Sequence, residues 1–130
     1  GTFSGTARFL KTEIPNLLAV AVEPKGSILG GGDPGPYDVE GIGMSVLHPT
    51  MDLDVADEII SVPDDRAFRY VRLLASECGV LAGSSAGAAV WAAVQVARRL
   101  GPGSRVVTLI PDSSERYLSK DIYDLHAESP

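Results

Sequence analysis

The fold class is decided by the stretch EIISVPDDRAFRYVRLLASECGVLAGSSAG, residues 58–87. It opens with an apolar run that Pro63 closes, and continues with helical periodicity over 64–78. A short apolar run over 80–82 follows, and small residues then begin a second helix. Near-continuous apolar runs are typical of parallel strands that are covered on both faces. Strand, helix and strand in succession therefore predict an α/β fold with right-handed crossovers.

Both helices of this stretch carry signals at their ends. Asp64 can cap the start of the helix over 64–78, and Gly79 stands where a helix commonly stops. The helix predicted over 85–100 is apolar almost all round at its start, so we expect it to be deeply buried. The apolar stripe predicted for the first helix consists of Ala67, Val71, Leu74 and Cys78.

On either side of this stretch, the apolar runs 17–22 and 105–110 predict two further strands, and residues 4–12 predict a short helix. Together these elements predict a three-layer αβα architecture around a mostly parallel sheet. Residues 26–50 lack periodicity and contain several glycines and prolines. A loop of that length inside an α/β unit usually carries function.

Composition excludes several classes of protein. The chain has 130 residues, 45% of them hydrophobic, a net charge of −6 and one cysteine. This apolar content predicts a folded core, and the acidic balance argues against a nucleic-acid partner. One cysteine excludes an internal disulfide framework and a cysteine-rich zinc site, and His48 and His126 stand alone, so we expect no metal site. The sequence shows neither a signal peptide nor a membrane segment, and we expect a cytoplasmic protein.

Three segments are candidate sites. Gly1-Thr2 precedes a predicted helix, where backbone N–H groups can bind an anion, although such a pair is more often only a helix cap. Ser113 follows the last predicted strand, at the edge of the sheet where ligands bind in α/β folds. Its hydroxyl could bind a ring nitrogen, or simply cap the next helical turn.

The third segment, Gly83 to Gly87, matches the Gly-x-Ser-x-Gly nucleophile elbow. The order Ser85, Asp112, His126 is also that of an α/β-hydrolase triad. The alternative interpretation is that small residues let the helix start close to the sheet or to a ligand. The hydrolase therefore stays open as a second function.

Five motifs in order resemble the C-terminal half of the pyridoxal-phosphate-dependent cysteine synthase and cystathionine β-synthase family, of fold type II. Residues 1–11 resemble the last Gly-Thr of the family's phosphate loop and the helix that follows it. Residues 19–27 resemble the next strand and turn, and 39–43 the Gly-Ile-Gly active-site loop. Residues 79–87 and 109–119 resemble the two remaining motifs. The resemblance covers residues 1–123 and leaves 124–130 as a flexible tail.

The resemblance implies roles for five residues. Gly1 and Thr2 would bind the phosphate of pyridoxal 5′-phosphate, and Ser113 would bind its pyridine nitrogen. Gly41 and Gly43 would let the backbone approach the substrate. The implied reaction, of a lyase or transferase in cysteine biosynthesis, replaces the β-substituent of serine or O-acetylserine by sulfide or a thiol.

The resemblance also implies that part of the enzyme lies outside this chain. The family binds its cofactor covalently through a lysine in the N-terminal half, and none of Lys11, Lys25 and Lys120 occupies a matching position. We therefore expect an incomplete fold type II large domain, inactive alone, whose partners are the missing N-terminal half, a second copy in a homodimer and an amino-acid substrate. Without that half, apolar surface on the sheet or on the helix 85–100 should be exposed.

Overall fold

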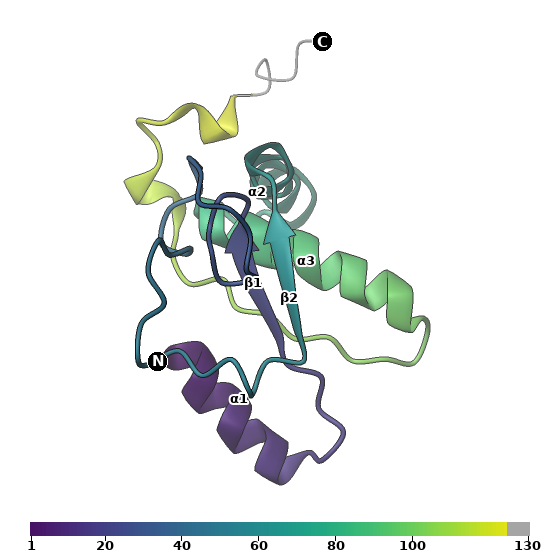
Figure 1. Cartoon of the computed structure of the whole chain (residues 1–130). Coiled ribbons are helices and arrows are strands. Elements are labelled where there is room, and N and C mark those ends of the chain that lie inside the picture. The colour runs from purple at the N-terminus through teal and green to yellow at the C-terminus, as the bar shows by residue number, and fades with distance from the viewer. Residues whose placement is uncertain (125–130) are drawn as a thin grey trace.

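The computed structural model describes residues 1–124 and contains three helices and a small parallel sheet (Figure 1). Two short 3₁₀ turns, η1 and η2, follow the last helix. The tail predicted over 124–130 therefore lies almost entirely outside the described residues. The elements are α1 (Thr2–Glu13), β1 (Val20–Pro24), β2 (Glu58–Val62), α2 (Asp64–Cys78), α3 (Ser84–Leu100), η1 (Ser114–Arg116) and η2 (Asp121–Tyr123).

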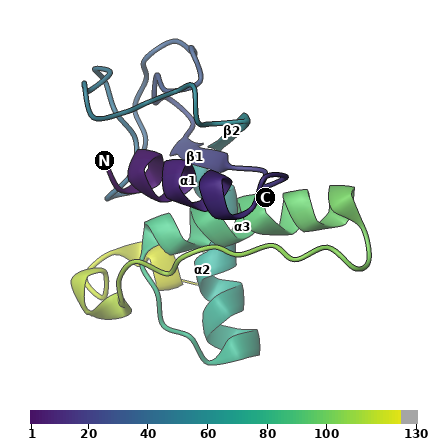
Figure 2. The ribbon, with the colours of Figure 1, turned by 90° about the horizontal axis from the view of Figure 1, so that it is seen from below.

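The sheet consists of β1 and β2, which pair in parallel from Val20 opposite Glu58 to Pro24 opposite Val62. The long loop 25–57 joins them; it contains the segment 26–50 that was predicted as a loop and extends further, to Asp57. Helix α3 packs against both strands and against α2 (Figures 1 and 2). The buried core between these elements is formed by Val39, Val62, Ala67, Ala88 and Ala92.

Small residues allow α2 and α3 to approach closely. A Cβ atom added at Gly87 would lie 2.1 Å from the backbone oxygen of Ala67 and 2.7 Å from a methyl of Val71. The predicted end of α2 is confirmed, because Gly79 adopts a left-handed conformation (φ 66°), its N–H donates to the Ala75 carbonyl, and the N–H of Val80 donates to the Leu74 carbonyl.

The prediction of four strands is wrong for this chain. Residues 80–82 contribute only one antiparallel bridge, between Ala82 and Ser113, and 105–110 form no strand. Within residues 1–124 no backbone hydrogen bond joins 105–110 to another segment, and Val107 and Leu109 are 81% and 69% exposed. An extended segment becomes a strand only when a neighbour supplies its hydrogen bonds, and the described chain supplies none here.

Two smaller differences concern where the core ends. Cys78 is exposed rather than part of the buried stripe, because the last turn of α2 extends beyond the core. Strand β1 lies about two residues later than predicted and includes Glu23. That carboxylate is buried, and it accepts hydrogen bonds from the amides of Leu29 (2.8 Å) and Gly30 (3.0 Å).

Candidate functional site

The starts of α1 and α3 lie on the same side of the molecule as η1 (Figures 1 and 2). A helix start presents backbone N–H groups without intrahelical partners, together with the positive end of the helix dipole. The sequence-predicted residues are distributed around these two helix starts and the loop that connects β1 to β2.

Gly1 is the N-cap of α1, and no side chain caps this helix. Gly1 and Thr2 are both exposed, and the first turn contains no acidic residue. The helix is held to the loop before β2 by ion pairs from Arg8 to Asp52 and from Lys11 to Asp57. An accessible helix start with no competing carboxylate in its own first turn can bind an anion.

The loop around Gly41 is anchored at three successive amides. The Asp64 carboxylate accepts hydrogen bonds from the amides of Asp38 (2.9 Å) and Val39 (3.2 Å). The next amide, of Glu40, donates to the Ser84 hydroxyl at 2.9 Å. Because Ser84 is the first residue of α3, this bond fixes the loop against the start of that helix.

Gly41 and Gly43 both require glycine, for different reasons. Gly41 has a φ of 83°, and its backbone faces Ser85, whose hydroxyl oxygen lies 3.8 Å from where a Cβ would be. Gly43 has a φ of 94° and is crowded, since a Cβ there would lie 2.7 Å from both Pro24 and the Tyr37 hydroxyl. A ligand can therefore approach the backbone closely at Gly41, whereas Gly43 is needed for the crowded turn that follows it.

Ser113 lies beside the start of α3 because its backbone bridges Ala82, which directly precedes the α3 N-cap, Gly83. Its side chain is exposed, and its hydroxyl donates to the Glu115 carboxylate. That hydrogen bond lowers the pKa of Glu115 below its usual value. The structure thus brings Ser113 and Gly41 to one helix start, and leaves Gly1 and Thr2 at the start of another.

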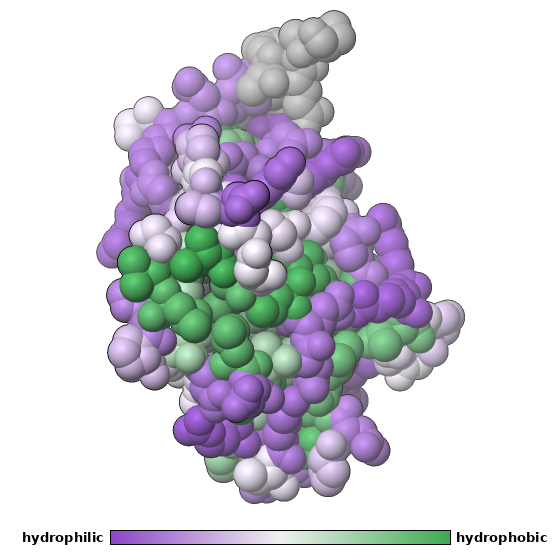
Figure 3. Space-filling view, viewed as in Figure 1, coloured by the Kyte–Doolittle hydropathy of each residue, from purple (hydrophilic) through white to green (hydrophobic). Residues whose placement is uncertain are grey.

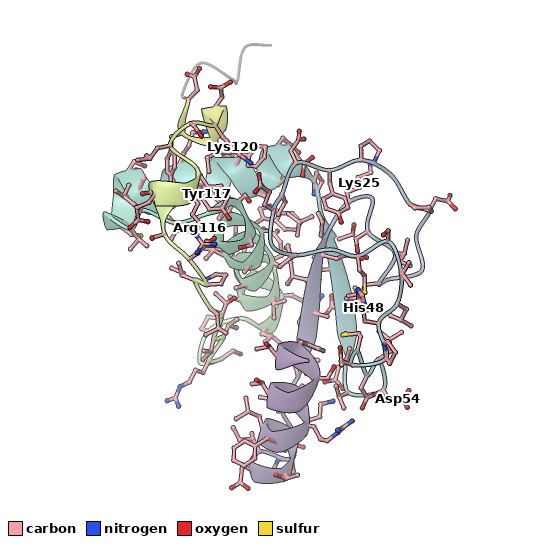
Figure 4. The ribbon with its side chains drawn as sticks, turned by 90° about the vertical axis from the view of Figure 1, so that its left-hand side faces the viewer. Lys25, His48, Asp54, Arg116, Tyr117 and Lys120 are labelled. Atoms are coloured by element: carbon pink, nitrogen blue, oxygen red, sulfur yellow. The ribbon has the colours of Figure 1, made fainter. Side chains whose placement is uncertain are left out.

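A hydrogen-bonded pair beside Ser113, formed by Asp112 and Tyr117, was not predicted from the sequence. The Tyr117 hydroxyl donates to Asp112 Oδ2 at 2.7 Å, and the tyrosine is only 4% exposed. Burial, with a smaller contribution from Asp112, raises the pKa of Tyr117. Lys120, three residues further on, forms an ion pair with Glu40 of the loop. Figure 4 shows Tyr117, Arg116 and Lys120 together, on the opposite side of the view from Lys25 and His48.

The hydrolase triad predicted as an alternative is not assembled in the described residues. Ser85 is buried, and the Oδ2 atom of Asp112 is occupied by Tyr117. His126 lies outside the described residues. Within residues 1–124 no group of three or more histidine, cysteine and acidic side chains is placed to hold a metal, and no helix is long and apolar enough to cross a membrane.

A family model described as pyridoxal-phosphate dependent enzyme matches residues 1–112, most of the chain. The chain belongs to this family. It is 51% identical to a cysteine synthase of Helicobacter pylori and 50% identical to an O-acetylserine dependent cystathionine beta-synthase of Bacillus subtilis, in each case over 95% of this chain.

Solved structures agree with this assignment. The crystal structure of the O-acetylserine dependent cystathionine beta-synthase of Helicobacter pylori superposes with a TM-score of 0.86 at 49% identity, over 94% of this chain and 40% of that one. An O-ureido-L-serine synthase superposes with a TM-score of 0.90 at 31% identity, over 99% of this chain and 41% of that one. These neighbours confirm the fold type II class. The chain spans about 40% of the length of its curated relatives.

Pyridoxal phosphate is the cofactor of this family, and the described residues fit it. The phosphate needs backbone donors that no acidic side chain of the same helical turn competes for, and the exposed start of α1 offers them. The pyridine ring of the cofactor needs an accessible hydrogen-bonding group, which the exposed side chain of Ser113 offers. It also needs backbone that can approach it closely, which the space at Gly41 allows. Two of the three lysines are already paired, Lys11 with Asp57 and Lys120 with Glu40.

Proposed function

We propose that this chain is the cofactor-binding portion of a pyridoxal-phosphate-dependent enzyme of sulfur amino-acid metabolism. The reaction is β-replacement on serine or O-acetylserine by sulfide or a thiol, giving cysteine or cystathionine. The observation that carries the proposal is the identity of 50–51% to enzymes of both activities, over 95% of the chain. Because the two identities are nearly equal, the acceptor is left as sulfide or a thiol.

In this proposal, Gly1 and Thr2 bind the cofactor phosphate through the N–H groups at the start of α1 and the threonine hydroxyl. Pyridoxal phosphate, when bound, supplies an electron sink for loss of the β-substituent of an amino acid. The Ser113 hydroxyl would bind the ring nitrogen after rotating away from the Glu115 carboxylate, to which it donates in this structure. A neutral hydroxyl leaves that nitrogen less positive than a carboxylate would, which favours β-elimination over free carbanion chemistry.

The loop 39–43 contributes the conformation of its backbone to the proposed site. The anchored amides of Asp38, Val39 and Glu40 hold the loop, so that the backbone at Gly41 can approach the amino-acid substrate next to the start of α3. None of the three lysines is assigned the covalent bond to the cofactor. That residue belongs to the part of the enzyme that this chain does not contain, and the chain alone is expected to be inactive.

The partner that fits this chain best is the remainder of the same enzyme. The segment 105–110 is extended and exposes Val107, Leu109 and Ile110, and Leu81 is exposed as well. Figure 3 shows apolar side chains gathered on the face beside β1. An unpaired edge with apolar side chains favours association with a further strand. A homodimer and a cytoplasmic location belong to the same proposal, and gel filtration of the full-length protein tests the first of them.

Cofactor binding by the full-length polypeptide tests the proposal. We expect pyridoxal phosphate to bind with its characteristic absorbance, and Thr2→Ala to weaken binding of pyridoxal phosphate much more than that of pyridoxal, which lacks the phosphate. Thr12→Ala is the matched control, since Thr12 stands at the other end of α1 and its hydroxyl donates to Phe9 and Glu13 of the same helix. Equal effects of both substitutions would contradict phosphate binding at this helix start. Product analysis with O-acetylserine and either sulfide or homocysteine then identifies the acceptor.

A further inference from the structure

The backbone of Gly41-Ile42-Gly43 lies between two anchored segments of the long loop. The N–H groups of these three residues have no hydrogen-bond partner within residues 1–124. Glycine adopts positive and negative φ about equally readily, so a backbone with glycine at two of three positions has little stiffness of its own. The side chain of Ile42 packs against the core. The backbone conformation on either side of it therefore depends on what holds the two ends of the tripeptide.

The end that precedes Gly41 is tied to the starts of α2 and α3 through the three successive amides described above. The end that follows Gly43 is tied to the turn after β1. There the Met44 amide donates to the Ser27 hydroxyl at 3.0 Å, and this hydroxyl donates to the Met44 carbonyl at 3.3 Å. The Met44 carbonyl also accepts a hydrogen bond from the Ile28 amide at 3.1 Å. One serine side chain thus bonds to both backbone groups of the residue after the tripeptide.

Ser27 is itself firmly held. It is only 3% exposed, and its amide donates at 3.0 Å to the carbonyl of Pro24, the last residue of β1. The buried Glu23 carboxylate of the same strand accepts hydrogen bonds from two amides later in this turn. Among the described residues, the Ser27 hydroxyl is the sole partner of the Met44 amide. Ser27 therefore connects the end of the sheet to the end of the tripeptide.

We propose that Ser27 is a positioning residue, which holds the backbone of Gly41-Ile42-Gly43 in place through Met44. This inference rests on the proposed function, because it takes Gly41 as the point where an amino-acid substrate approaches the backbone. Ser27 is too deeply buried to touch that substrate. Without its hydroxyl, the Ile28 amide makes the one remaining hydrogen bond at this end, and the glycine-rich backbone gains other conformations. The substrate must then order this backbone as it binds, which costs affinity.

The first test measures hydrogen exchange of individual amides in the full-length protein without cofactor. Ser27→Ala removes only the hydroxyl, and we expect the Met44 amide to exchange about tenfold faster, as for the loss of one hydrogen bond. The amides of Asp38 and Val39 are an internal control, since they donate to the start of α2 instead. Ser61→Ala is the matched control variant, because Ser61 is exposed on β2 and its hydroxyl forms no hydrogen bond within residues 1–124. Unchanged exchange of the Met44 amide in Ser27→Ala would overturn the inference.

The second test follows the amino-acid substrate in the protein loaded with pyridoxal phosphate. In Ser27→Ala, the O-acetylserine concentration that half-saturates the change in cofactor absorbance should rise about tenfold, as when about one further residue is ordered on binding. The affinity for pyridoxal phosphate should change much less, since its phosphate and ring nitrogen are assigned to Thr2 and Ser113. Ser61→Ala should change neither quantity. Wild-type substrate affinity in Ser27→Ala, or an equal loss of affinity for cofactor and substrate, would overturn the inference.

Two further outcomes are distinguished by the same measurements. If Ser27→Ala does not fold, Ser27→Cys takes its place, because a thiol is a weaker donor and acceptor and should produce the same changes at smaller size. Absence of pyridoxal phosphate binding in the wild-type protein would overturn the proposed function. The exchange experiment, which needs no cofactor, would still decide whether Ser27 holds the loop.

Discussion

The close contact between α2 and α3 makes Gly87→Ala the most informative stability variant. The new Cβ atom would lie 2.1 Å from the Ala67 carbonyl oxygen, whereas real Cβ contacts essentially never fall below 3.0 Å. The two helices must therefore separate by nearly 1 Å, because the obstructing atom belongs to the backbone and cannot rotate away. Ala67 and Val71 are fully buried at this crossing, so the separation also loosens the core.

The expected magnitude follows from two opposing effects. Overpacking a core costs about 1–3 kcal/mol, and a rigid backbone partner places this site at the upper end. Alanine is favoured over glycine within a helix by about 1 kcal/mol. The net result should be a loss of about 2 kcal/mol in the free energy of unfolding.

Urea unfolding of the full-length protein, followed by circular dichroism, measures this loss. Gly5→Ala in α1 is the control, because a Cβ there meets nothing within 4 Å. That variant should gain about 0.5–1 kcal/mol from helix propensity alone. If Gly87→Ala were as stable as the wild type, or if both variants shifted in the same direction, the close packing of α2 on α3 would be refuted.

Three further variants test other parts of the structure. Glu23→Ala leaves the buried amide of Leu29 and the partly buried amide of Gly30 without their acceptor, and should cost about 2–3 kcal/mol in urea unfolding; a loss below about 1 kcal/mol would contradict this. The hydrogen bond from Lys11 lowers the pKa of Asp57, so its stabilisation is complete above pH ~4 and is lost as pH falls through the lowered value. Asp57→Asn should therefore unfold with a weaker dependence on pH between about 2 and 5, and an unchanged dependence would argue against the ion pair. Gly43→Ala forces a side chain into a left-handed and crowded position, and should reduce turnover of the full-length enzyme about tenfold; unimpaired turnover would contradict the strain.

The elements predicted correctly are those whose signals are local. Helix α2 begins at Asp64 and ends at Cys78 as predicted, because Pro63, the acidic first turn and Gly79 act within one turn of each end. Strand β2 also has its predicted bounds, 58–62. The family motifs likewise identified the family, since each is a short local pattern whose order is visible in the sequence.

The features that could not be predicted from the sequence depend on contacts between residues that are not adjacent in the chain. Residues 105–110 have the composition of a strand, yet composition cannot show whether a neighbour is present to pair with them. Glu23 lies just beyond the strand predicted over 17–22, yet it is buried within β1 because the amides of Leu29 and Gly30 in the following loop donate hydrogen bonds to its carboxylate. The packing of Asp112 and Tyr117 against the backbone of Gly83 joins segments that are about thirty residues apart in the chain, and no spacing rule indicates it.

The unpaired segment 105–110 also bears on how such a polypeptide matures. If the remainder of the enzyme precedes these residues, as the resemblance to a C-terminal half implies, the ribosome releases this edge only after the earlier strands have been made. The surface to which residues 105–110 dock then already exists when they leave the ribosome. The time during which this unpaired edge can aggregate or be cleaved by proteases is therefore short.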